Sequence, residues 1–340
     1  MSSLPDLITA KDGHRDAELG RLPILILNVH SHCNCRCLMC DIWQRTKHEQ
    51  INAADLERHR ESLRKLGVQQ VVLSGGEPLL HTDLEPLCSF FREQGIRLTL
   101  LTTGLLLHKR AREVAAHFDE VIVSIDGPAS VHDAIRRVPG AFALICRGVA
   151  AVRALRPHMR ISCRTTVQKT NHHQLCATAR AARQAGFDAI SFLAADLTSE
   201  AFNRPLIWPG ERQSTIALTQ AEIGVLETQV DALLGLNAEW DTRFVSEGRE
   251  KLERIVRHFR VHLDLASPIA PICNAPWVSA VIETDGSLRP CFFHRAIGNV
   301  HSSTLDEAIN GDRGRSFRQA LDVERNPTCR RCVCSLNYSG

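Results

Sequence analysis

Four cysteines lie within eight positions of the chain, at Cys33, Cys35, Cys37 and Cys40, directly after a run of aliphatic residues. Thiols so close together can bind zinc, form disulfides, act as a redox pair or hold an iron–sulfur cluster. Three of them, Cys33, Cys37 and Cys40, are separated by three and then two residues. Zinc needs four ligands, and Cys35 or a nearby histidine could complete such a set, so the spacing alone leaves both metal sites open.

The cysteine content of the whole chain favours metal or cluster binding over disulfides. The sequence has 13 cysteines, an odd number, and its first residues lack the basic start and apolar stretch of a secretory signal. We therefore expect a cytoplasmic protein, and the cytosol keeps thiols reduced. Cys88, Cys146, Cys163 and Cys176 occur singly inside periodic segments, which is typical of small buried hydrophobic residues.

The composition is that of a folded globular protein with no strong electrostatic partner. The chain has 340 residues and a net charge of +3, with 44% hydrophobic and 23% charged residues, so we do not expect disorder. It contains no long block of lysine and arginine, which argues against nucleic acid or an anionic membrane as a partner. The longest aliphatic run, residues 22–29, is much shorter than the ~18 residues of a membrane span.

Residues 22–195 alternate between β-rich runs and amphipathic stretches. Near-continuous apolar strands separated by helices predict a parallel sheet that is covered by those helices. Right-handed crossovers wind such a sheet into a complete or partial barrel, with ligands at the carboxyl ends of the strands. The expected strands are 22–29, 69–76, 97–104, 120–126, 160–167 and 189–195, and the expected helices are 53–67, 83–95, 109–118, 141–156 and 173–186.

Polar and glycine residues follow the expected strands at the same edge of this sheet. The first cysteine cluster follows strand one, Gly75, Gly76 and Glu77 end strand two, and Ser124 and Asp126 end strand four. Glycines allow the backbone to approach a ligand closely, and a carboxylate can accept hydrogen bonds from an ammonium group. The alternatives are a glycine turn with a solvated glutamate and an ordinary turn at Asp126. We interpret the shared edge as a binding site.

The cysteine spacing, followed by Gly-Gly-Glu-Pro after the next strand, resembles the radical S-adenosylmethionine (SAM) superfamily. The resemblance covers the six-strand core, about half of the chain. It implies that Cys33, Cys37 and Cys40 hold three irons of a [4Fe–4S] cluster whose fourth iron binds SAM. Cys35 would then be spare, and we expect it to point away. Met39 stands where the family usually has an aromatic residue, and a structural zinc site would leave Gly-Gly-Glu-Pro unexplained.

The same resemblance implies a pocket for SAM along the edge. Glu77 and the two glycines before it would bind the amino group of SAM, with Glu77 as the acceptor. Ser124 and Arg136 would contact the SAM carboxylate, for which a planar guanidinium is suited, and Asp126 is a candidate for the ribose. The family usually has glycine after this arginine, and Arg137 stands there instead, which leaves open which guanidinium is used.

A second group of cysteines lies near the C-terminus, where a hairpin is expected to turn at Asp285 and Gly286. The pattern resembles the short "twitch" version of the SPASM extension, which implies one auxiliary [4Fe–4S] cluster. Zinc bound by the same thiolates, or with His294, is the alternative. The implied ligands are Cys273, Cys291, Cys329 and Cys332, with Cys334 as an alternative ligand; if one of the last two does not ligate, an iron is left open for substrate.

We divide the chain into a short N-terminal extension, a radical SAM core, a connection that covers the substrate side and an auxiliary cluster domain. The fold class expected is α/β, a partial (β/α)6 TIM-like barrel with a small C-terminal twitch/SPASM-type cluster-binding domain. Helices are expected at 220–234 and 246–262 in the connection and at 304–309 in the last domain. The four parts are residues 1–21, 22–195, 196–270 and 271–340.

The irregular segment after Asp196 is expected to line the substrate pocket, because loops above such an edge often carry specificity. Asp196, Asn203, Arg204 and Trp208 are its candidates, and Asp196 and Arg204 are the candidates for a role in catalysis. The alternative is that Asp196 caps a helix and that the aromatic residues of this segment pack against the auxiliary domain.

The function expected is that of a radical SAM enzyme. It would cleave SAM reductively to a 5′-deoxyadenosyl radical, which takes hydrogen from a small-molecule substrate in a dehydrogenation or rearrangement. A flavodoxin or ferredoxin would supply electrons, and neither nucleic acid nor membrane is expected as a partner. Alternatives are a maturase of a ribosomally made peptide, an enzyme that cleaves SAM at another carbon–sulfur bond, and a zinc protein without enzymatic activity.

Overall fold

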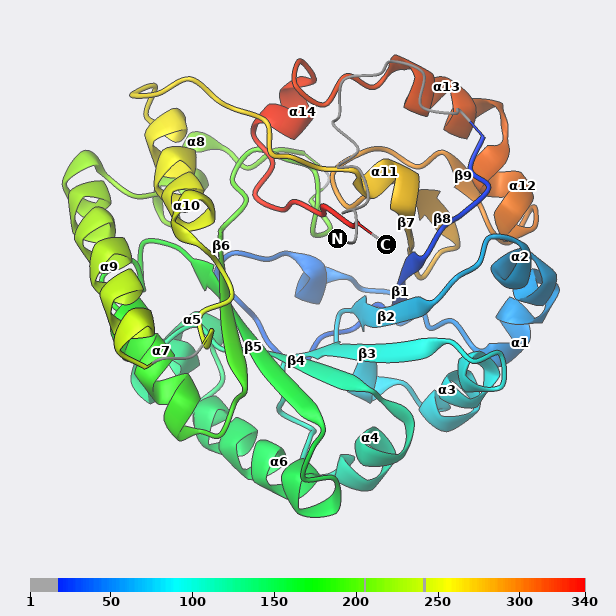
Figure 1. Cartoon of the computed structure of the whole chain (residues 1–340), viewed down its shortest axis with the longest axis horizontal. Coiled ribbons are helices and arrows are strands. Elements are labelled where there is room, and N and C mark those ends of the chain that lie inside the picture. The colour runs from blue at the N-terminus through cyan, green and yellow to red at the C-terminus, as the bar shows by residue number, and fades with distance from the viewer. Residues whose placement is uncertain (1–17, 205, 241–242, 340) are drawn as a thin grey trace, which may run out of the picture.

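The computed structural model describes residues 18–204, 206–240 and 243–339, and their strands form one curved sheet (Figure 1). The strand order is β6-β5-β4-β3-β2-β1-β7-β8-β9, and the pairs from β6 to β7 are all parallel. The fold class expected from the sequence, a partial parallel α/β barrel, is confirmed. The strands are β1 (Ile24–His30), β2 (Gln70–Gly75), β3 (Arg97–Thr102), β4 (Glu120–Ser124), β5 (Arg160–Val167), β6 (Ala189–Ala194), β7 (Ser279–Ile282), β8 (Ser287–Arg289) and β9 (Gly298–Asn299).

Helices cover the outer side of the sheet, and the inner side stays partly accessible (Figure 1). Along β5, for example, exposed or half-buried residues alternate with fully buried ones, because successive side chains point to opposite faces. The exposed and half-buried residues of β5 therefore point away from the helices, toward the inner side of the sheet, which we call the lumen. The helices between the strands are α1 (Ala53–Leu56), α2 (Arg60–Lys65), α3 (Leu84–Arg92), α4 (Ala111–His117), α5 (Ala129–Arg136), α6 (Ala141–Leu155) and α7 (Leu175–Gln184).

Two helical stretches differ from the sequence prediction. The expected helix over residues 53–67 is divided by a 3-10 turn, η2 (Glu57–His59), between α1 and α2. The stretch before α6 contains a separate helix, α5, which ends at Arg137 in the left-handed conformation with φ 55°. These breaks depend on packing that the period of the hydrophobic residues does not reveal.

The connection after β6 covers the edge of the sheet. It contains α8 (Gly210–Ser214), α9 (Gln220–Glu239) and α10 (Arg249–His262), and α9 packs on both α7 and α10. Val245 pairs with Ile190 of β6 in a short parallel bridge, and the Phe192 amide donates to the Glu247 carboxylate at 3.0 Å. The open edge of β6 is thereby paired rather than left exposed.

The C-terminal region continues the sheet of the barrel. β7 runs parallel beside β1, and the predicted hairpin is confirmed: β7 pairs antiparallel with β8 around Gly286, whose φ is 78°. After the hairpin come α12 (Leu305–Asn310), α13 (Asp312–Ala320) and α14 (Pro327–Arg330), and α11 (Ala275–Val278) precedes it. The tail returns to this region, because the Asn274 amide group bonds the Tyr338 backbone at 2.7 and 3.0 Å.

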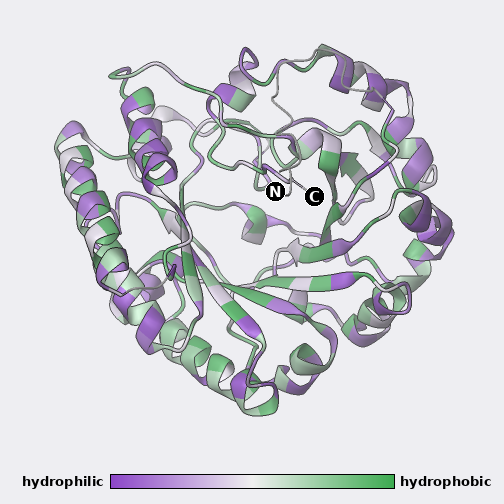
Figure 2. Ribbon diagram, in the orientation of Figure 1, coloured by the Kyte–Doolittle hydropathy of each residue, from purple (hydrophilic) through white to green (hydrophobic). Residues whose placement is uncertain are grey.

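Hydropathy follows this arrangement (Figure 2). Hydrophilic residues lie on the outward sides of the peripheral helices, and hydrophobic ones run along the strands. In the part of the chain described here, no single helix has the length and apolar composition to cross a membrane. Among the described residues, only α5 and α6 taken together are long and apolar enough, and they are bent by 107° relative to each other.

Candidate functional site

The first cysteine cluster forms a loop directly after β1. Cys35 and Cys37 are buried, and Cys33 and Cys40 are half-buried. Burial and the nearby thiols of Cys37 and Cys33 raise the pKa of Cys40 to about 12. The loop thus brings its thiols into one neighbourhood, which is the arrangement that a cluster needs.

The Cys35 thiol lies among the other thiols of the loop. It is only 1% exposed, and the raised pKa of its thiol comes first from hydrogen bonds with the Cys33 and Cys37 thiols. The bond from Cys35 in turn lowers the pKa of Cys37 to about 6. The expectation that Cys35 points away from the other thiols is therefore wrong, although the ligand set of Cys33, Cys37 and Cys40 stays a prediction.

The geometry of the thiols bears on the kind of metal site. Among the residues that the structure describes, no three His, Cys, Asp or Glu side chains are arranged to hold a single metal ion. Cysteines around a [4Fe–4S] cluster bind different irons, so their sulfurs need not converge on one point. The arrangement of the thiols is compatible with a cluster, and zinc stays the alternative.

The end of β2 holds the cysteine loop from one side. The Gly76 amide donates to the His30 carbonyl at 2.7 Å, and the Glu77 amide donates to the His32 carbonyl at 2.9 Å. A Cβ atom on Gly76 would lie 2.1 Å from the His32 carbonyl oxygen, and Gly75 has a φ of 122°. Both glycines are therefore required by the close approach of these two backbone segments.

Glu77 is fully buried, and protein donors surround its carboxylate. The carboxylate accepts from the Leu79 amide at 3.0 Å, from the Thr102 hydroxyl at 2.7 Å, and from the amide and hydroxyl of Thr103 at 2.7 and 2.6 Å. Burial raises the pKa of Glu77, and these hydrogen bonds oppose the rise. Glu77 thus ties β2 to the end of β3, and an ammonium group of SAM would have to share an acceptor that is already in use.

Asp126, Arg136 and Cys37 form a buried chain of contacts behind the loop. Arg136 Nε lies 2.6 Å from the Asp126 carboxylate, and Arg136 Nη1 donates to the Cys37 sulfur at 3.4 Å. The other oxygen of Asp126 accepts from the Thr166 amide at 2.9 Å. These two side chains are therefore already occupied by protein partners, whereas Arg137 is exposed. Their assignment to the carboxylate and ribose of SAM remains a prediction.

Two residues of interest were missed from the sequence, Arg164 on β5 and Gln168 directly after it. Arg164 pairs in register with Ser124, is exposed, and bonds the Ser191 hydroxyl at 3.3 Å. Gln168 is 0% exposed, and neither its amide nitrogen nor its amide oxygen has a hydrogen-bond partner. A buried amide without partners is uncommon in folded proteins. The alternation of side chains along β5 was the available signal for Arg164.

The structure brings the five C-terminal cysteines together. Burial raises the pKa of Cys291 to about 11 and that of Cys329 to about 12, and in each case neighbouring thiols add to the effect. Cys332 donates to the Cys334 carbonyl at 2.9 Å, and the His294 ring lies 3.4 Å from the Cys329 sulfur. Cys273 is close enough to Cys332 to affect the pKa of its thiol. The proximity fits an auxiliary cluster, but it does not distinguish Cys332 from Cys334 as the fourth ligand.

The irregular segment after β6 packs against the first cysteine loop. Arg204 is 3% exposed, lies 2.6 Å from the Asp196 carboxylate and donates to the Met39 carbonyl at 3.3 Å. The Trp208 ring lies under the Arg204 guanidinium at 3.7 Å, and its indole donates to Asp41 at 2.6 Å. Asn203 donates to the Asp41 carbonyl at 3.1 Å.

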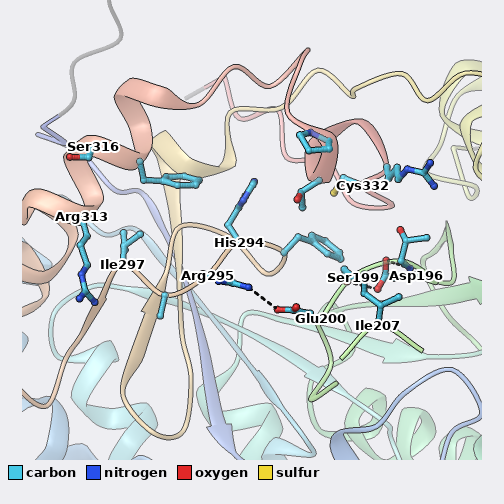
Figure 3. Close-up of a pocket in the computed structure, with 17 residues that line it drawn as sticks. Asp196, Ser199, Glu200, Ile207, His294, Arg295, Ile297, Arg313, Ser316 and Cys332 are labelled. Atoms are coloured by element: carbon cyan, nitrogen blue, oxygen red, sulfur yellow. Dashed lines mark hydrogen bonds and ion pairs between the residues drawn. The ribbon is translucent and has the colours of Figure 1, made fainter. Parts of the chain in front are cut away.

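Other residues of this segment line a cavity of about 970 Å³ (Figure 3). The opposite walls come from the loop after β8, from α13 and from the end of α14. Asp196 lines this cavity, whereas Asn203, Arg204 and Trp208 do not, since they are turned toward the cysteine loop. The lining residues are Asp196, Thr198, Ser199, Glu200, Ile207, Phe293, His294, Arg295, Ala296, Ile297, Arg313, Ser316, Phe317, Pro327, Thr328, Arg331 and Cys332.

Two family models match this chain. The model of the radical SAM superfamily matches residues 27–193, and that of an iron–sulfur cluster-binding domain, SPASM, matches residues 273–333. The first match begins within β1 and ends within β6, and the second contains Cys273, Cys291, Cys329 and Cys332.

Curated proteins match over less than half of the chain. Pre-heme d1 synthase of Dinoroseobacter shibae is 32% identical over 157 residues, which is 45% of this chain and 38% of that protein. Fe-coproporphyrin III synthase of Methanosarcina barkeri is 30% identical over 156 residues, 44% of this chain and 38% of that protein. A probable GTP 3′,8-cyclase of Methanococcus maripaludis is 36% identical over 104 residues, 29% of this chain and 35% of that protein. The chain thus spans only about two fifths of the length of these relatives.

Solved structures are similar over almost the whole chain. Streptococcus suis SuiB bound to the precursor peptide SuiA has a TM-score of 0.65 at 16% identity, covering 94% of this chain and 72% of that chain. Native anSMEcpe with bound AdoMet has a TM-score of 0.67 at 18% identity, covering 92% of this chain and 86% of that chain. At these identities the likeness concerns the fold.

Proposed function

We propose that this chain, a member of the radical SAM superfamily with a SPASM-type iron–sulfur cluster-binding domain, cleaves SAM reductively and removes hydrogen from a small-molecule substrate. SAM and iron–sulfur clusters are the cofactors of such a protein. The observation that carries the proposal is the cysteine loop, whose thiols gather at the edge where β1, β2 and β4 end.

In the proposed site, Cys33, Cys37 and Cys40 hold a [4Fe–4S] cluster and leave one iron for SAM. With both groups in place, one-electron reduction of SAM would give methionine and a 5′-deoxyadenosyl radical, which would take hydrogen from a substrate carbon. Arg136 donates to the Cys37 sulfur, and such hydrogen bonds help to set the reduction potential of a cluster.

Other residues of the chain position the cofactor and keep water away. Gly76 lets the end of β2 lie against the cysteine loop, and Glu77 fixes the end of β3 beside it. In this proposal SAM binds along these strand ends. Its amino group lies near Glu77 and the two glycines before it. Its carboxylate is bound by Ser124 and Arg136, and Asp126 is the candidate for its ribose. Arg164 is an additional candidate, because its exposed side chain is on β5 in register with Ser124 of β4.

The auxiliary site is proposed to hold one [4Fe–4S] cluster on Cys273, Cys291, Cys329 and either Cys332 or Cys334. Four protein ligands would leave no open iron and would suit electron transfer, so the net reaction would be a dehydrogenation. A flavodoxin or ferredoxin remains the proposed reductant, and the cytoplasm, where thiols stay reduced, remains the proposed location.

A peptide substrate is the second candidate, because the fold is similar to that of SuiB, which was solved with a precursor peptide. The sequence relatives favour a small molecule instead, since their names refer to haem-type compounds and GTP. These names apply to proteins that match less than half of this chain, so they support the class of substrate and not its identity.

The proposal is tested by anaerobic purification, reconstitution with iron and sulfide, and incubation with SAM and dithionite. We expect iron and acid-labile sulfide in the protein and formation of 5′-deoxyadenosine. Zinc without iron would contradict the proposal and support the zinc alternative. A different SAM fragment, with the clusters intact, would show cleavage at another carbon–sulfur bond.

A further inference from the structure

We propose that the 970 Å³ cavity between the segment after β6 and the auxiliary cysteine domain binds the substrate, and that this substrate is an organic anion with a flat apolar body and an acidic group at each end. That the occupant is a substrate rests on the proposed function. The chemistry of the occupant rests on the cavity itself.

The size of the cavity suits a small molecule. Pockets for drug-sized ligands and cofactors are roughly 300–1,000 Å³, and this cavity is at the upper end of that range. It also adjoins the auxiliary site, because Cys332 and His294 are part of its wall and the His294 ring lies 3.4 Å from the Cys329 sulfur.

Apolar side chains are a large part of the cavity lining. Phe293 comes from the loop after β8 and Phe317 from α13. Ile297 lies toward the Arg313 side of the cavity and Ile207 toward the Asp196 side (Figure 3). The Phe317 ring packs edge-on against His294 with 4.9 Å between the ring centroids. Aromatic faces held in this way offer stacking surfaces to a flat ring system.

The charges around the cavity favour an anion. The Asp196 carboxylate is neutralised by Arg204 at 2.6 Å, and Glu200 lies 3.9 Å from Arg295. Among the described residues, neither Arg313 nor Arg331 forms an ion pair, although both line the cavity. Unpaired guanidinium groups at the rim of an apolar cavity suit carboxylates, which they can bind with two hydrogen bonds.

The two unpaired arginines are at different ends of the cavity. Arg313 on α13 marks one end, and Cys332 lies toward the other end (Figure 3). Arg331 directly precedes Cys332 in the chain. A ligand that used both guanidinium groups would therefore carry acidic groups on opposite sides of its apolar body. A single acidic group would leave one arginine without a partner.

The competing interpretation is a solvent-filled gap between packed segments, with arginines that are simply solvated. The two interpretations differ in one measurable property, which is whether the arginines select ligands by charge. Three naphthalene dyes provide a graded series: N-phenyl-1-naphthylamine has no sulfonate, 8-anilinonaphthalene-1-sulfonate has one, and its dimer bis-ANS has two.

The test is equilibrium dialysis of the reconstituted full-length protein against each dye under anaerobic conditions. We expect affinity to rise with the number of sulfonates. Arg313→Ala and Arg331→Ala should each weaken bis-ANS by about tenfold, the size of one charge-assisted hydrogen bond, and should change the neutral dye by less than about twofold. Arg313→Lys should restore much of the bis-ANS affinity.

Two variants serve as controls. Arg325→Ala removes an exposed arginine from the same region, outside the cavity, and should leave the binding of all three dyes unchanged. Phe317→Ala should weaken all three dyes, which would show that they occupy this cavity. Arg313→Ala is the main test, because Arg313 is distant in sequence from the cysteines and its loss should not disturb the auxiliary site. Bound iron is measured in every variant to check this.

The proposal is overturned if bis-ANS binds equally to the wild-type protein and both arginine variants, or if the neutral dye is weakened as much as bis-ANS. A failure of the proposed function would look different. In that case the wild-type protein would form no 5′-deoxyadenosine, while the dependence of dye affinity on charge and on Arg313 would still be observed.

Discussion

At the level of single side chains, the cysteine loop depends on groups that lie elsewhere in the chain. Arg136 donates to the Cys37 sulfur, and Arg204 donates to the Met39 carbonyl. Each of these arginines is itself held by a buried carboxylate, Asp126 or Asp196. A buried charge is stable only when it is paired, so the loop and its two ion pairs form one unit.

The assignment of cluster ligands leads to the first prediction. Cys33→Ala, Cys37→Ala and Cys40→Ala should each lower bound iron from about eight to about four atoms per chain and abolish 5′-deoxyadenosine formation. Cys35→Ala should keep both, because its thiol contacts the ligands but is not needed to hold an iron. Iron analysis and product chromatography test this. Loss of iron in Cys35→Ala, with retention in Cys37→Ala, would show that the assignment is wrong.

Arg204 is now expected to act in folding rather than in substrate binding. Arg204→Ala leaves the Asp196 carboxylate buried without its guanidinium, which should lower the free energy of unfolding by about 3–5 kcal/mol. Urea unfolding of the protein measures this. Arg249→Ala, which removes a solvent-exposed ion pair with Asp231, is the control and should cost less than about 1 kcal/mol. Similar small losses in both variants would contradict the structural role.

The buried His132 should make the free energy of unfolding depend on pH. Burial, assisted by Arg136, lowers its pKa to about 3, and its ring nitrogen accepts from the Asp126 amide at 3.1 Å, so the folded protein holds the neutral form. Protonation of the unfolded chain below its pKa of about 6.5 then favours unfolding. The contribution of His132 is fully present above about pH 6.5 and is lost progressively as the pH falls toward 3.

The measurement compares the wild-type protein with His132→Gln, which cannot be protonated. Between pH 7.5 and pH 5 the wild-type protein should lose about 2 kcal/mol more free energy of unfolding than His132→Gln does. A difference that stays constant between the two pH values would mean that His132 does not titrate in this way.

At the level of elements, the site depends on how closely the end of β2 approaches the loop after β1. The two segments are joined by backbone hydrogen bonds at 2.7 and 2.9 Å, and no side chain fits between them at Gly76. Strands that pair in parallel place their carboxyl ends at one edge, so this contact follows from the pairing of β1 with β2.

Gly76→Ala should therefore disrupt the first cluster. The added Cβ would lie 2.1 Å from the His32 carbonyl oxygen, so one of the two backbones must move. We expect loss of about four iron atoms per chain and of SAM cleavage. The matched control is Gly235→Ala in α9, where a Cβ meets no atom within 4 Å and should stabilise the helix by up to about 1 kcal/mol. Retention of full iron in Gly76→Ala would contradict the argument.

At the level of the whole molecule, one sheet joins the two cysteine sites. β7 pairs with β1, so the hairpin that precedes Cys291 is continuous with the strand that precedes Cys33. The C-terminal tail closes the auxiliary site, because Asn274 beside Cys273 is bonded to Tyr338. The segment that lines the cavity also reaches the first loop through Arg204.

Asn274→Ala should impair the auxiliary cysteine site and leave the first cysteine site active. The tail that carries Cys332 and Cys334 then loses two of its bonds next to Cys273 and keeps the one from the backbone amide of residue 274 to the Leu336 carbonyl. We expect bound iron to fall toward four atoms per chain, while SAM cleavage by the first cluster persists. Asn237→Ala, which removes a bond to the Val245 amide and contacts none of the proposed cluster ligands, should keep both clusters. Loss of SAM cleavage in Asn274→Ala would show that the two sites are not independent.

Much of the fold and the family could be predicted from local patterns in the sequence. The six parallel strands, the hairpin at Gly286 and the family were confirmed, because strand alternation and cysteine spacing are properties of neighbouring residues. Even the shared edge of the site follows from the rule that parallel strands end on the same side.

The tertiary structure alone decided which side chains meet. The sequence gives no sign that Arg136 contacts Cys37, 99 positions away, or that Arg204 contacts Met39, 165 positions away. It also failed to show that Glu77 is surrounded by donors from β3, or that Cys35 lies among the thiols. Such contacts depend on the packing of crossovers and on competition among nearby donors, and neither leaves a periodic trace along the chain.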